Sequence, residues 1–326
     1  MEIEPVQGRA ANNPADDNFG DVLVVGGGIS GIQAALDLAS TGFKVYLVDK
    51  SPAIGGKMAQ LDKTFPTNDC SMCIESPKFL ECRRHPNIVL LTHTNVDRVE
   101  GKTGDFKVTL TKRPRYIIED KCTGCTTCAQ YCPVKVPDPY NQDLSFNKAV
   151  HIYFSQAVPL VSYIDPDACL YLQGEQCTIC LGVCEHKAID FDQEEEKLEI
   201  KVGAIVLSPG FEIFDPKLRG DYGYGAMQNV VTSLDFERLL SATGPNEGVL
   251  KRPSDGKHPH NIAWIHCVGS RQVRAGGNSY CSSVCCTYTQ KQVILAKDHD
   301  AEIQATIFHN TPRMPGLEMP PPGVLH

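Results

Sequence analysis

The chain has 326 residues, including 15 cysteines, and a formal net charge of −8 at pH 7. This length allows several domains with cores of their own, so the cysteines are not needed to hold a small fold together. The first residues are polar and no later stretch is long and apolar enough to cross a bilayer, so we expect no secretory signal, no membrane span and a cytoplasmic location. In a reducing compartment, an odd number of cysteines indicates metal binding or redox chemistry, and the acidic balance argues against a nucleic-acid partner.

A strand, a glycine turn, a helix and a second strand are predicted in residues 21–50. Val22–Val25 form an apolar run typical of a buried parallel strand, and the glycines after it fit G-x-G-x-x-G. Such glycines let the backbone turn tightly and approach a pyrophosphate at a helix N-terminus, whereas a glycine-rich packing turn is the alternative. Asp49 ends the second strand, where an acidic residue accepts hydrogen bonds from a ribose. The dinucleotide-binding residues predicted in this segment are Gly26, Gly28, Ile29, Ser30, Gly31, Asp49 and Lys50.

Another glycine pair follows the acidic strand. Gly55 and Gly56 offer a second approach free of side chains, and with Lys57 they complete this part of the predicted cofactor site. The pair resembles FAD enzymes with two dinucleotide-binding domains. An ordinary turn is the alternative, and the pair by itself does not distinguish FAD from NAD.

Three cysteines lie between this segment and the next motif. Cys70 and Cys73 are spaced C-x-x-C, which suits a redox dithiol or half of a metal site. Together with Cys82 they remain one thiolate short of a four-cysteine cluster, so structural and redox roles both stay open.

A bacterial ferredoxin pattern, C-x2-C-x2-C-x3-C-P, begins at Cys122. Zinc sites typically use two separated C-x-x-C knuckles or include histidine, so this spacing favours [4Fe–4S] clusters. A second, irregular copy begins at Cys169, and in two-cluster ferredoxins the last cysteine of each run crosses to the other cluster. We therefore expect two ligand sets, which are Cys122, Cys125, Cys128 and Cys184 for one cluster and Cys169, Cys177, Cys180 and Cys132 for the other.

The ferredoxin module is predicted to be an insertion at residues 112–190. The stretch FKVTLTKR before it alternates like a strand. The stretch KLEIKVGAIVLSPG after it alternates and then becomes an apolar run, 204–207, that returns to a buried sheet. The FAD-binding domain would then comprise residues 21–111 and 191–225, preceded by a disordered arm at 1–20.

Residues 226–308 are predicted to form a partial second nucleotide-type domain. They contain the helix-like stretch TSLDFERLLSATG and a buried strand, Ile262–Ile265, but the turn after this strand carries Cys267 in place of a glycine-rich phosphate loop. The thiols that open the next predicted helix are Cys281, Cys285 and Cys286. Four thiolates could converge on a further cluster there. Buried inert cysteines are the alternative, because C-x3-C-C is not a standard run.

Together these motifs resemble the A-type subunit of heterodisulfide reductase, a flavin and iron–sulfur protein of methanogens and other anaerobes. The resemblance covers roughly residues 21–308 and rests on GGGISG, TFPTNDCSMC, KCTGCTTCAQYCPV, RPSDGK and CVGSR followed by YCSSVCC. It implies an α/β fold, with a thioredoxin-reductase-like dinucleotide-binding domain, an inserted two-cluster ferredoxin module and a partial second nucleotide-type α/β domain. It also implies FAD and about three [4Fe–4S] clusters. The third cluster is non-standard in this family and is bound by the cysteines that match Cys267, Cys281, Cys285 and Cys286.

The activity that the resemblance implies is flavin-based electron bifurcation within an oxidoreductase complex. Two electrons would arrive from a hydrogenase or formate dehydrogenase partner. One would go to ferredoxin, and the other would pass through subunits of the B and C type to the disulfide CoM-S-S-CoB or an analogue, in a homodimeric complex. Lys291 matches a family lysine near the reactive edge of the isoalloxazine, where a positive charge favours reduced flavin; a plain surface lysine is the alternative.

The sequence departs from the family in two places. Ser208–Gly210 stands where the family has an alanine-threonine-glycine turn, whose glycine, here Gly210, contacts FAD. The tail at 309–326 is rich in proline and reads as irregular, although family members continue much further. We therefore expect a C-terminally truncated copy. Such a copy could be a non-catalytic electron carrier or assembly module, and a subunit of a quinone-interacting oxidoreductase complex is a further alternative.

Overall fold

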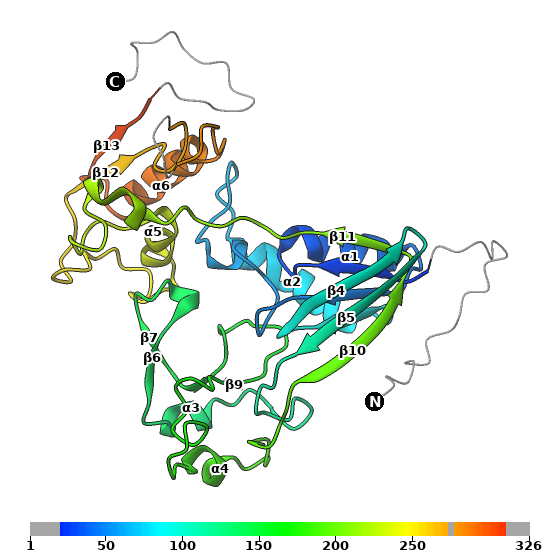
Figure 1. The fold of residues 1–326 in the computed structure, drawn as a ribbon. Helices are drawn as coiled ribbons and strands as arrows, with labels where there is room; N and C mark the ends of the chain where they lie inside the picture. Colours follow the sequence, from blue (N-terminus) through cyan, green and yellow to red (C-terminus); the bar gives the residue numbers. More distant parts are fainter. Residues whose placement is uncertain (1–19, 273–276, 311–326) are drawn as a thin grey trace. The chain divides into compact units, whose positions relative to one another are not determined.

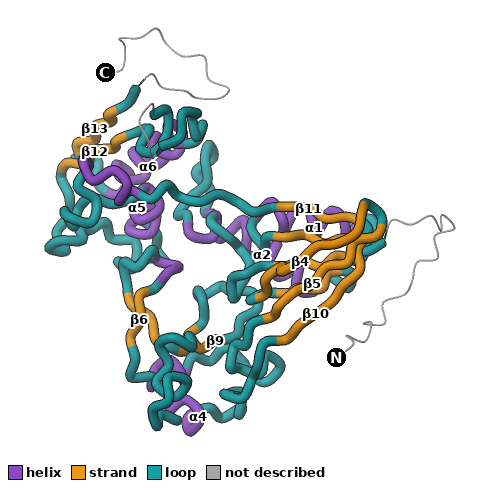
Figure 2. The backbone as a smooth tube through the Cα atoms, in the orientation of Figure 1, coloured by secondary structure: helices purple, strands orange, loops and turns teal. Residues whose placement is uncertain are grey.

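The computed structural model describes most of the chain, namely residues 20–272 and 277–310. The predicted N-terminal arm and C-terminal tail fall almost entirely outside these ranges. Figure 1 labels many of the helices and strands of the described chain, and Figure 2 shows the same backbone coloured by secondary structure.

Two compact units make up the described chain. The first contains the residues up to Ala59 and Met72–Phe211, and the second contains Gln60–Ser71 and the residues from Glu212 onward. The glycine turn and the ferredoxin cysteines therefore belong to the first unit. The later group of cysteines, which starts at Cys267, belongs to the second.

A parallel sheet of four strands in the order β11-β1-β2-β3 lies in the first unit. The strands are β1 (Val22–Val25), β2 (Val45–Val48), β3 (Ile88–Leu91) and β11 (Ala204–Leu207). Helix α1 (Ile29–Ser40) connects β1 to β2, and its apolar face buries Ile32, Ala35 and Leu36 in the core beside the sheet. The strand, turn, helix and strand predicted at 21–50 are thus confirmed.

Strand β11 returns to the parallel sheet, as its apolar run predicts. It pairs in parallel with β1, with Ala204 opposite Val22. Among the described strands β11 lies at the edge of the sheet, and Leu207 is 72% exposed. An apolar run is typical of a buried parallel strand, but here the edge position leaves the end of the strand uncovered.

A second sheet of three antiparallel strands also lies in the first unit, in the order β10-β5-β4. Its strands are β4 (Thr94–Lys102), β5 (Asp105–Lys112) and β10 (Glu196–Val202). In β10, Leu198, Ile200 and Val202 are buried and alternate with exposed charged residues, which is the pattern predicted for this stretch. These side chains share one hydrophobic cluster with Leu23 and Val48 of the parallel sheet, so the two sheets pack on a common core.

The segment between β5 and β10 leaves and re-enters this sheet at neighbouring positions. Lys112, the last residue of β5, pairs with Glu196, the first residue of β10. A further bridge between Ile117 and Ile189 brings the two ends of the segment together again. The segment therefore leaves the sheet and returns to it at the same end of the paired strands β5 and β10. Backbone pairing holds the two ends of the segment together.

Short elements fill this inserted segment. They are α3 (Thr127–Tyr131), β6 (Lys135–Pro137), the 3-10 helix η2 (Pro139–Asn141), β7 (Phe146–Lys148), β8 (Val150–His151), β9 (Tyr163–Ile164) and α4 (Ile179–Val183). Its core combines apolar side chains such as Ile117, Val150 and Ile164 with the cysteines Cys128 and Cys169. The cysteines thus take part in the packing of the segment.

A pair of parallel strands, with a helix between them in the chain, lies in the second unit. The elements of this unit are η3 (Pro216–Tyr222), α5 (Ser233–Leu240), β12 (Asn261–Ile265), α6 (Cys285–His299) and β13 (Gln304–Phe308). Strand β12 pairs with β13, and α5 begins with a capping box between Thr232 and Asp235. The strand and the two helices predicted in this part are confirmed, but the prediction that the strand is buried is wrong. Only Trp264 of β12 is buried and Ile265 is 46% exposed, because among the described strands only β13 pairs with β12. Among the described helices, none is both long and apolar enough to cross a membrane.

One buried carboxyl group of helix α2 (Ser71–Arg84) lacks a partner. Glu75 is fully buried, and neither of its carboxylate oxygens has a hydrogen-bond partner among the described residues. Burial raises the pKa of Glu75 to about 8. The folded chain therefore keeps a proton on Glu75 at pH values where the unfolded chain has lost it.

We predict that Glu75→Gln stabilises the fold at alkaline pH. The unfolded carboxyl ionises near pH 4.5 and the folded one near pH 8, so between these values stability declines as pH rises, by roughly 3–5 kcal/mol in total. The midpoint of thermal unfolding, measured at several pH values across this window, should fall with pH in the wild type and stay much flatter in Glu75→Gln. Glu81→Gln, at an exposed position of the same helix, is the matched control and should keep the wild-type slope. Equal slopes in all three proteins would contradict the prediction.

Candidate cofactor and metal centres

The turn between β1 and α1 requires glycine at two positions. A Cβ atom on Gly26 would lie 2.1 Å from the carbonyl oxygen of Ser208, and one on Gly31 would lie 1.8 Å from the carbonyl oxygen of Gly26. Gly26 also has a φ of 107°, in the region that favours glycine. Packing alone thus explains these two glycines.

Gly28 differs from them because space remains beside it. It is the N-cap residue of α1, no side chain caps the helix there, and a Cβ atom on it would meet only the Cα of Gly56, 3.8 Å away. A backbone bridge between Gly28 and Gly55 holds the two glycine segments side by side. An uncapped helix N-terminus beside bare backbone fits a pyrophosphate group.

Asp49 follows β2, and its carboxylate is held by the backbone. Its Oδ2 accepts a hydrogen bond from the N–H of Gly27 at 2.5 Å, and its Oδ1 accepts one from the N–H of Ser51 at 2.7 Å. These bonds place the carboxylate at the carboxyl end of the parallel strands, beside the glycine turn. A ribose hydroxyl group bound there could donate to it.

The other predicted cofactor contacts lie in the same unit. Ile29 and Ser30 are the first two residues of α1. Burial, followed by the charge of Lys50, lowers the pKa of Lys57. Gly210 has a φ of 70°, and no atom lies within 4 Å of the place that its Cβ would occupy, so its backbone is open to a ligand.

Two cavities in the inserted segment are lined by cysteines. Each contains about 340 Å³ of empty space, which includes open solvent at its mouth. One is lined by Cys122, Cys125, Cys128 and Cys184, and the other by Cys132, Cys169, Cys177 and Cys180. The structure brings together the same two sets that the crossed ferredoxin pattern predicts, while ligation of iron by them stays a prediction.

The electrostatics of the two cavities favour a cationic occupant. Burial raises the pKa of the Cys180 thiol to about 12, and the charge of nearby Cys169 adds to the shift. The pKa of the Cys128 thiol is also raised, mainly by burial and to a smaller extent by Cys122 and Cys125. Crowded thiols ionise together only when positive charge compensates them, and the iron of a [4Fe–4S] cluster supplies that charge. The donor sets therefore fit such clusters.

A third group of cysteines lies where β12 ends and α6 begins. Cys285 and Cys286 are the first two residues of α6 and are buried. Cys267 follows β12 with a φ of 60°, a left-handed conformation that costs a non-glycine residue about 1–3 kcal/mol. Burial raises the pKa of Cys267, and the charges of Cys285 and Cys281 add to the shift, so these thiols are close enough to interact. Cys267 thus lies near Cys285 and Cys281, and the Sγ of Cys285 lies within 4.8 Å of the Sγ of Cys286, while ligation of one cluster by all four thiols stays a prediction.

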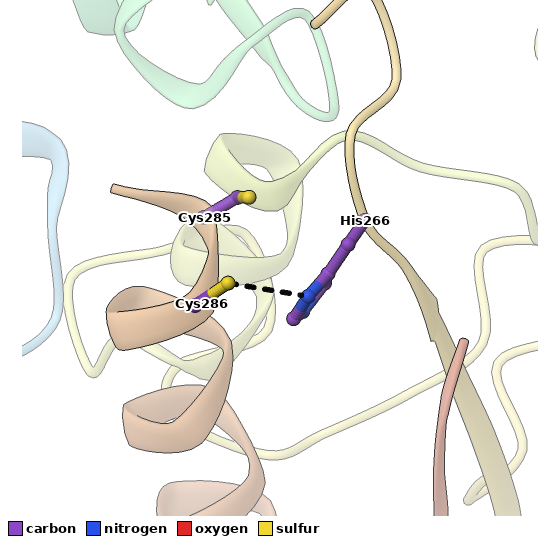
Figure 3. A group of neighbouring side chains, drawn as sticks. All are labelled: His266, Cys285 and Cys286. Carbon is purple, nitrogen blue, oxygen red and sulfur yellow. Dashed lines mark hydrogen bonds between the residues drawn. The ribbon is translucent and has the colours of Figure 1, made fainter. Parts of the chain in front are cut away.

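Sequence analysis missed one further side chain in this group, that of His266. Its Nδ1 lies 3.8 Å from the Sγ of Cys286, and ligand atoms of His266, Cys285 and Cys286 all lie within 4.8 Å of one another (Figure 3). Burial, followed by the neighbouring His309, lowers the pKa of His266. A single histidine has no spacing pattern, so its position just before Cys267 was the only available signal.

The three cysteines left open by the sequence have two different roles in the structure. Cys70 and Cys73 are disulfide-bonded, whereas Cys82 is free and buried. Burial raises the pKa of Cys82 to about 12, and its Sγ lies 3.9 Å from the carbonyl oxygen of Ile32. Cys82 is therefore a core residue. The disulfide occupies both thiols and so argues against half of a metal site, while structural and redox roles of C-x-x-C both stay predictions.

Lys291 is not a surface lysine. Its side chain is 3% exposed, and its Nζ lies 2.9 Å from the Oε2 of Glu237 and donates to the carbonyl oxygen of Lys63 at 2.7 Å. Glu237 is equally buried and accepts a second hydrogen bond from the Nε2 of Gln292 at 2.8 Å. Burial, followed by the charge of Glu237, raises the pKa of neighbouring Asp62. The alternative of a plain surface lysine is wrong, while a role of Lys291 in tuning a flavin stays a prediction.

Two segments of the chain match known protein families. Residues 21–74 match the family of FAD dependent oxidoreductases, and residues 115–138 match the 4Fe-4S binding domain. The first segment contains the glycine turn and Asp49, and the second contains the cysteines from Cys122 to Cys132. FAD and a [4Fe–4S] cluster are therefore the cofactors that these two segments indicate.

Relatives in methanogens match nearly the whole chain. The chain is 47% identical over 307 residues to the A-type subunit of the H(2):CoB-CoM heterodisulfide,ferredoxin reductase of Methanothermobacter marburgensis, covering 94% of this chain and 45% of that protein. It is 47% identical over 287 residues to the A-type subunit of the H(2)/formate:CoB-CoM heterodisulfide,ferredoxin reductase of Methanococcus maripaludis, covering 88% and 43%. The chain spans less than half the length of these relatives. Among solved structures, L-proline dehydrogenase from P. horikoshii matches with a TM-score of 0.38 and 14% identity, covering 89% of this chain and 35% of that one.

We predict that Cys184→Ala removes the same cluster as Cys125→Ala, although the two residues belong to different cysteine runs. Cys132→Ala should remove the other ferredoxin cluster. Each variant should lose roughly a third of the bound iron and acid-labile sulfide, and EPR spectra of the reduced proteins should show which signal is lost.

Cys82→Ala is the matched control for these variants, because Cys82 is a buried free thiol outside both cavities. It should keep the full iron content. If Cys184→Ala lost the same signal as Cys132→Ala, the crossed arrangement would be wrong.

We predict that Lys291→Met destabilises the second unit by about 3–5 kcal/mol, because it leaves the carboxylate of Glu237 buried without its counter-charge. The double variant with Glu237→Gln removes both charges and should recover most of the loss. Urea unfolding can be followed by fluorescence of Trp264, the only tryptophan, which donates to Gln292 beside the pair. Lys297→Met, at an exposed position of the same helix, removes only the hydrogen bond from Nζ to the carbonyl oxygen of Ile303 and should cost no more than about 1 kcal/mol. Equal losses in the single and double variants would contradict the ion-pair explanation.

Proposed function

Over the part that it spans, the chain is a homologue of the A-type subunits of the heterodisulfide reductases, and we propose that it transfers electrons between FAD and [4Fe–4S] clusters in a complex of that type. The observation that carries this proposal is the composition of the first unit. One compact body contains both the glycine turn and the two cysteine-lined cavities. A nucleotide site and two metal sites in one body are the parts that an electron-transfer protein requires.

The short helices of the inserted segment place the two cavities next to each other. Helix α3 contains Cys128 and ends at its C-cap residue Cys132, and these two cysteines line different cavities. Helix α4 repeats the arrangement with Cys180 and its C-cap residue Cys184. Four residues of helix rise by about 6 Å, so each helix reaches from one cavity to the next. This spacing supports electron transfer between two clusters through a single turn of backbone.

FAD accepts or donates two electrons, whereas each [4Fe–4S] cluster carries one. The residues around Gly28 and Asp49 would bind and orient the dinucleotide through backbone N–H groups and a carboxylate acceptor. The cysteines of the inserted segment would bind the clusters and keep them at a fixed separation. In this division of roles the chain positions the carriers, and substrate chemistry belongs to its partners.

We infer that the complete reaction is flavin-based electron bifurcation in a homodimeric complex. A hydrogenase or a formate dehydrogenase would be the donor, ferredoxin would be one acceptor, and subunits of the B and C type would pass electrons to CoM-S-S-CoB or an analogous disulfide. The names of the relatives support this inference, because they combine dihydrogen or formate, a CoB-CoM heterodisulfide and ferredoxin. The whole reaction is a proposal for this chain, which covers less than half of either relative.

The second unit would contribute a further cluster and a tuning charge. We propose that Cys267, Cys281, Cys285 and Cys286 bind this cluster. The positive charge of Lys291 would favour the reduced flavin. A charge in a buried, low-dielectric setting acts more strongly than one on the surface, and the carboxylate of Glu237 would set how much of it remains.

We predict that Gly28→Val prevents FAD binding and leaves the fold intact. Gly28 has an ordinary extended conformation, with φ −78° and ψ 179°, and a Cβ atom on it would be in ordinary contact with the Cα of Gly56 at 3.8 Å, so the backbone accepts a side chain there, which would block the approach of the pyrophosphate. Anaerobically purified wild-type protein should contain FAD, measured by its absorption after extraction, and the variant should bind it at least roughly tenfold more weakly. Iron and acid-labile sulfide should be unchanged in the variant.

Gly220→Ala, where a Cβ atom meets no neighbour within 4 Å, is the control and should keep its FAD. A wild-type chain that contains clusters but no FAD would support the alternative of a cluster-bearing electron carrier or assembly module. A chain that contains neither FAD nor acid-labile sulfide would contradict both functions.

A further inference from the structure

His266 lies in the third cysteine group although no ligand pattern includes it. It directly follows β12, and its backbone N–H donates to the carbonyl oxygen of Phe308, at the end of β13, at 2.9 Å. The strand pair thus fixes its backbone. From there the side chain extends toward the first turn of α6, and the sulfur atoms of Cys285 and Cys286 lie on the side of that turn facing the ring (Figure 3).

The imidazole makes a polar contact with one of these thiols. Its Nδ1 lies 3.8 Å from the Sγ of Cys286, within the range of a hydrogen bond to sulfur. Its Nε2 is buried and has no hydrogen-bond partner among the described residues. The ring of His309 lies beside it, with 6.5 Å between the ring centroids. Within the described part of the chain, the contact with Cys286 is therefore the hydrogen bond that orients the ring.

We propose that His266 donates a hydrogen bond from Nδ1–H to the thiolate of Cys286 and thereby raises the reduction potential of the cluster bound by the third cysteine group. The inference rests on the proposed function, because it requires a cluster on those thiolates. A donated hydrogen bond withdraws negative charge from sulfur, and the reduced cluster, which carries one more negative charge, gains more from this than the oxidised one. His266 is a positioning residue, since it contacts a ligand and not the iron.

Ligand number favours this role over direct coordination. A separation of 3.8 Å between nitrogen and sulfur would also suit two ligands of a single metal ion, each bound at about 2.0–2.3 Å. A [4Fe–4S] cluster with four cysteine ligands has one thiolate on each iron. If the four cysteines of the proposed cluster fill these positions, the imidazole is left as a donor to a ligand sulfur.

Three variants of the full chain, purified anaerobically, test the inference. His266→Leu removes the donor, and His266→Asn keeps an N–H group close to the position of Nδ1. His309→Leu removes the neighbouring ring, which lies at an exposed position, and serves as the matched control. The EPR signal of the third cluster is identified first, as the signal that Cys281→Ala abolishes. A redox titration followed by EPR then measures the midpoint potential of that signal in each protein.

We expect the equilibrium constant for one-electron reduction to fall roughly tenfold in His266→Leu, which is a downward shift of about 59 mV. His266→Asn should recover most of this shift, and His309→Leu should keep the wild-type potential. Equal potentials in the wild type and in His266→Leu would overturn the inference and leave the proposed function intact. A wild-type chain that lacks the third cluster, shown by its iron content, would overturn both.

If His266→Leu failed to assemble the third cluster, pulsed EPR of the wild type would decide. Labelling with ¹⁵N-histidine should then reveal a weak nitrogen coupling together with a coupling to an exchangeable proton. A strong coupling typical of iron-bound imidazole would overturn the inference in favour of coordination, and the absence of any histidine coupling would overturn it altogether.

Discussion

The antiparallel pairing of β5 with β10 is the interaction on which the first unit depends. Because Lys112 and Glu196 face each other across this ladder, the chain can leave the sheet and return to it without breaking a row of hydrogen bonds. The side chains beneath, such as Leu110 and Ile200, are buried against the parallel sheet, and each fully buried side chain of this size contributes roughly 1.5–3 kcal/mol. The ladder therefore fixes where the segment that carries the cysteines begins and ends, while Tyr140, Phe154 and Val158 of that segment also pack in the core beside the nucleotide-binding sheet.

Buried polar groups have a different role at each centre. Lys291 and Glu237 satisfy each other, so the second unit contains a charged pair that needs no ligand for its stability. In the inserted segment, burial and then neighbouring thiols raise the pKa of Cys128 and Cys180, so these two thiols ionise readily only when a cation binds beside them. Asp49 lies between these cases, because the backbone N–H groups that hold it leave room for further donors. The Lys291–Glu237 pair thus stabilises the fold by itself, whereas the cysteines and Asp49 are available to bind a cofactor.

Patterns within one element were predictable from the sequence, whereas contacts between elements were not. The alternation in β10, the apolar run of β1 and the spacing of the ferredoxin cysteines each depend on a local repeat, and the structure has the expected elements there. The edge position of β11 depends on the order of the strands in the sheet, and the local sequence of one strand does not predict that order. The burial of Lys291 depends on Glu237, some fifty positions away in another helix, so an amphipathic pattern could not distinguish it from a surface lysine. The contact between His266 and Cys286 likewise joins the end of a strand to the start of a helix.

The crossed lining of the two cavities has a consequence for biosynthesis. The cavity that contains Cys122, Cys125 and Cys128 is completed by Cys184, a residue that a ribosome adds long after the other three. Until then, the nascent chain has only three of the four thiols that line this cavity. A cluster with four cysteine ligands can therefore form in this cavity only after translation has passed Cys184. The other cavity is completed only four residues earlier, by Cys180.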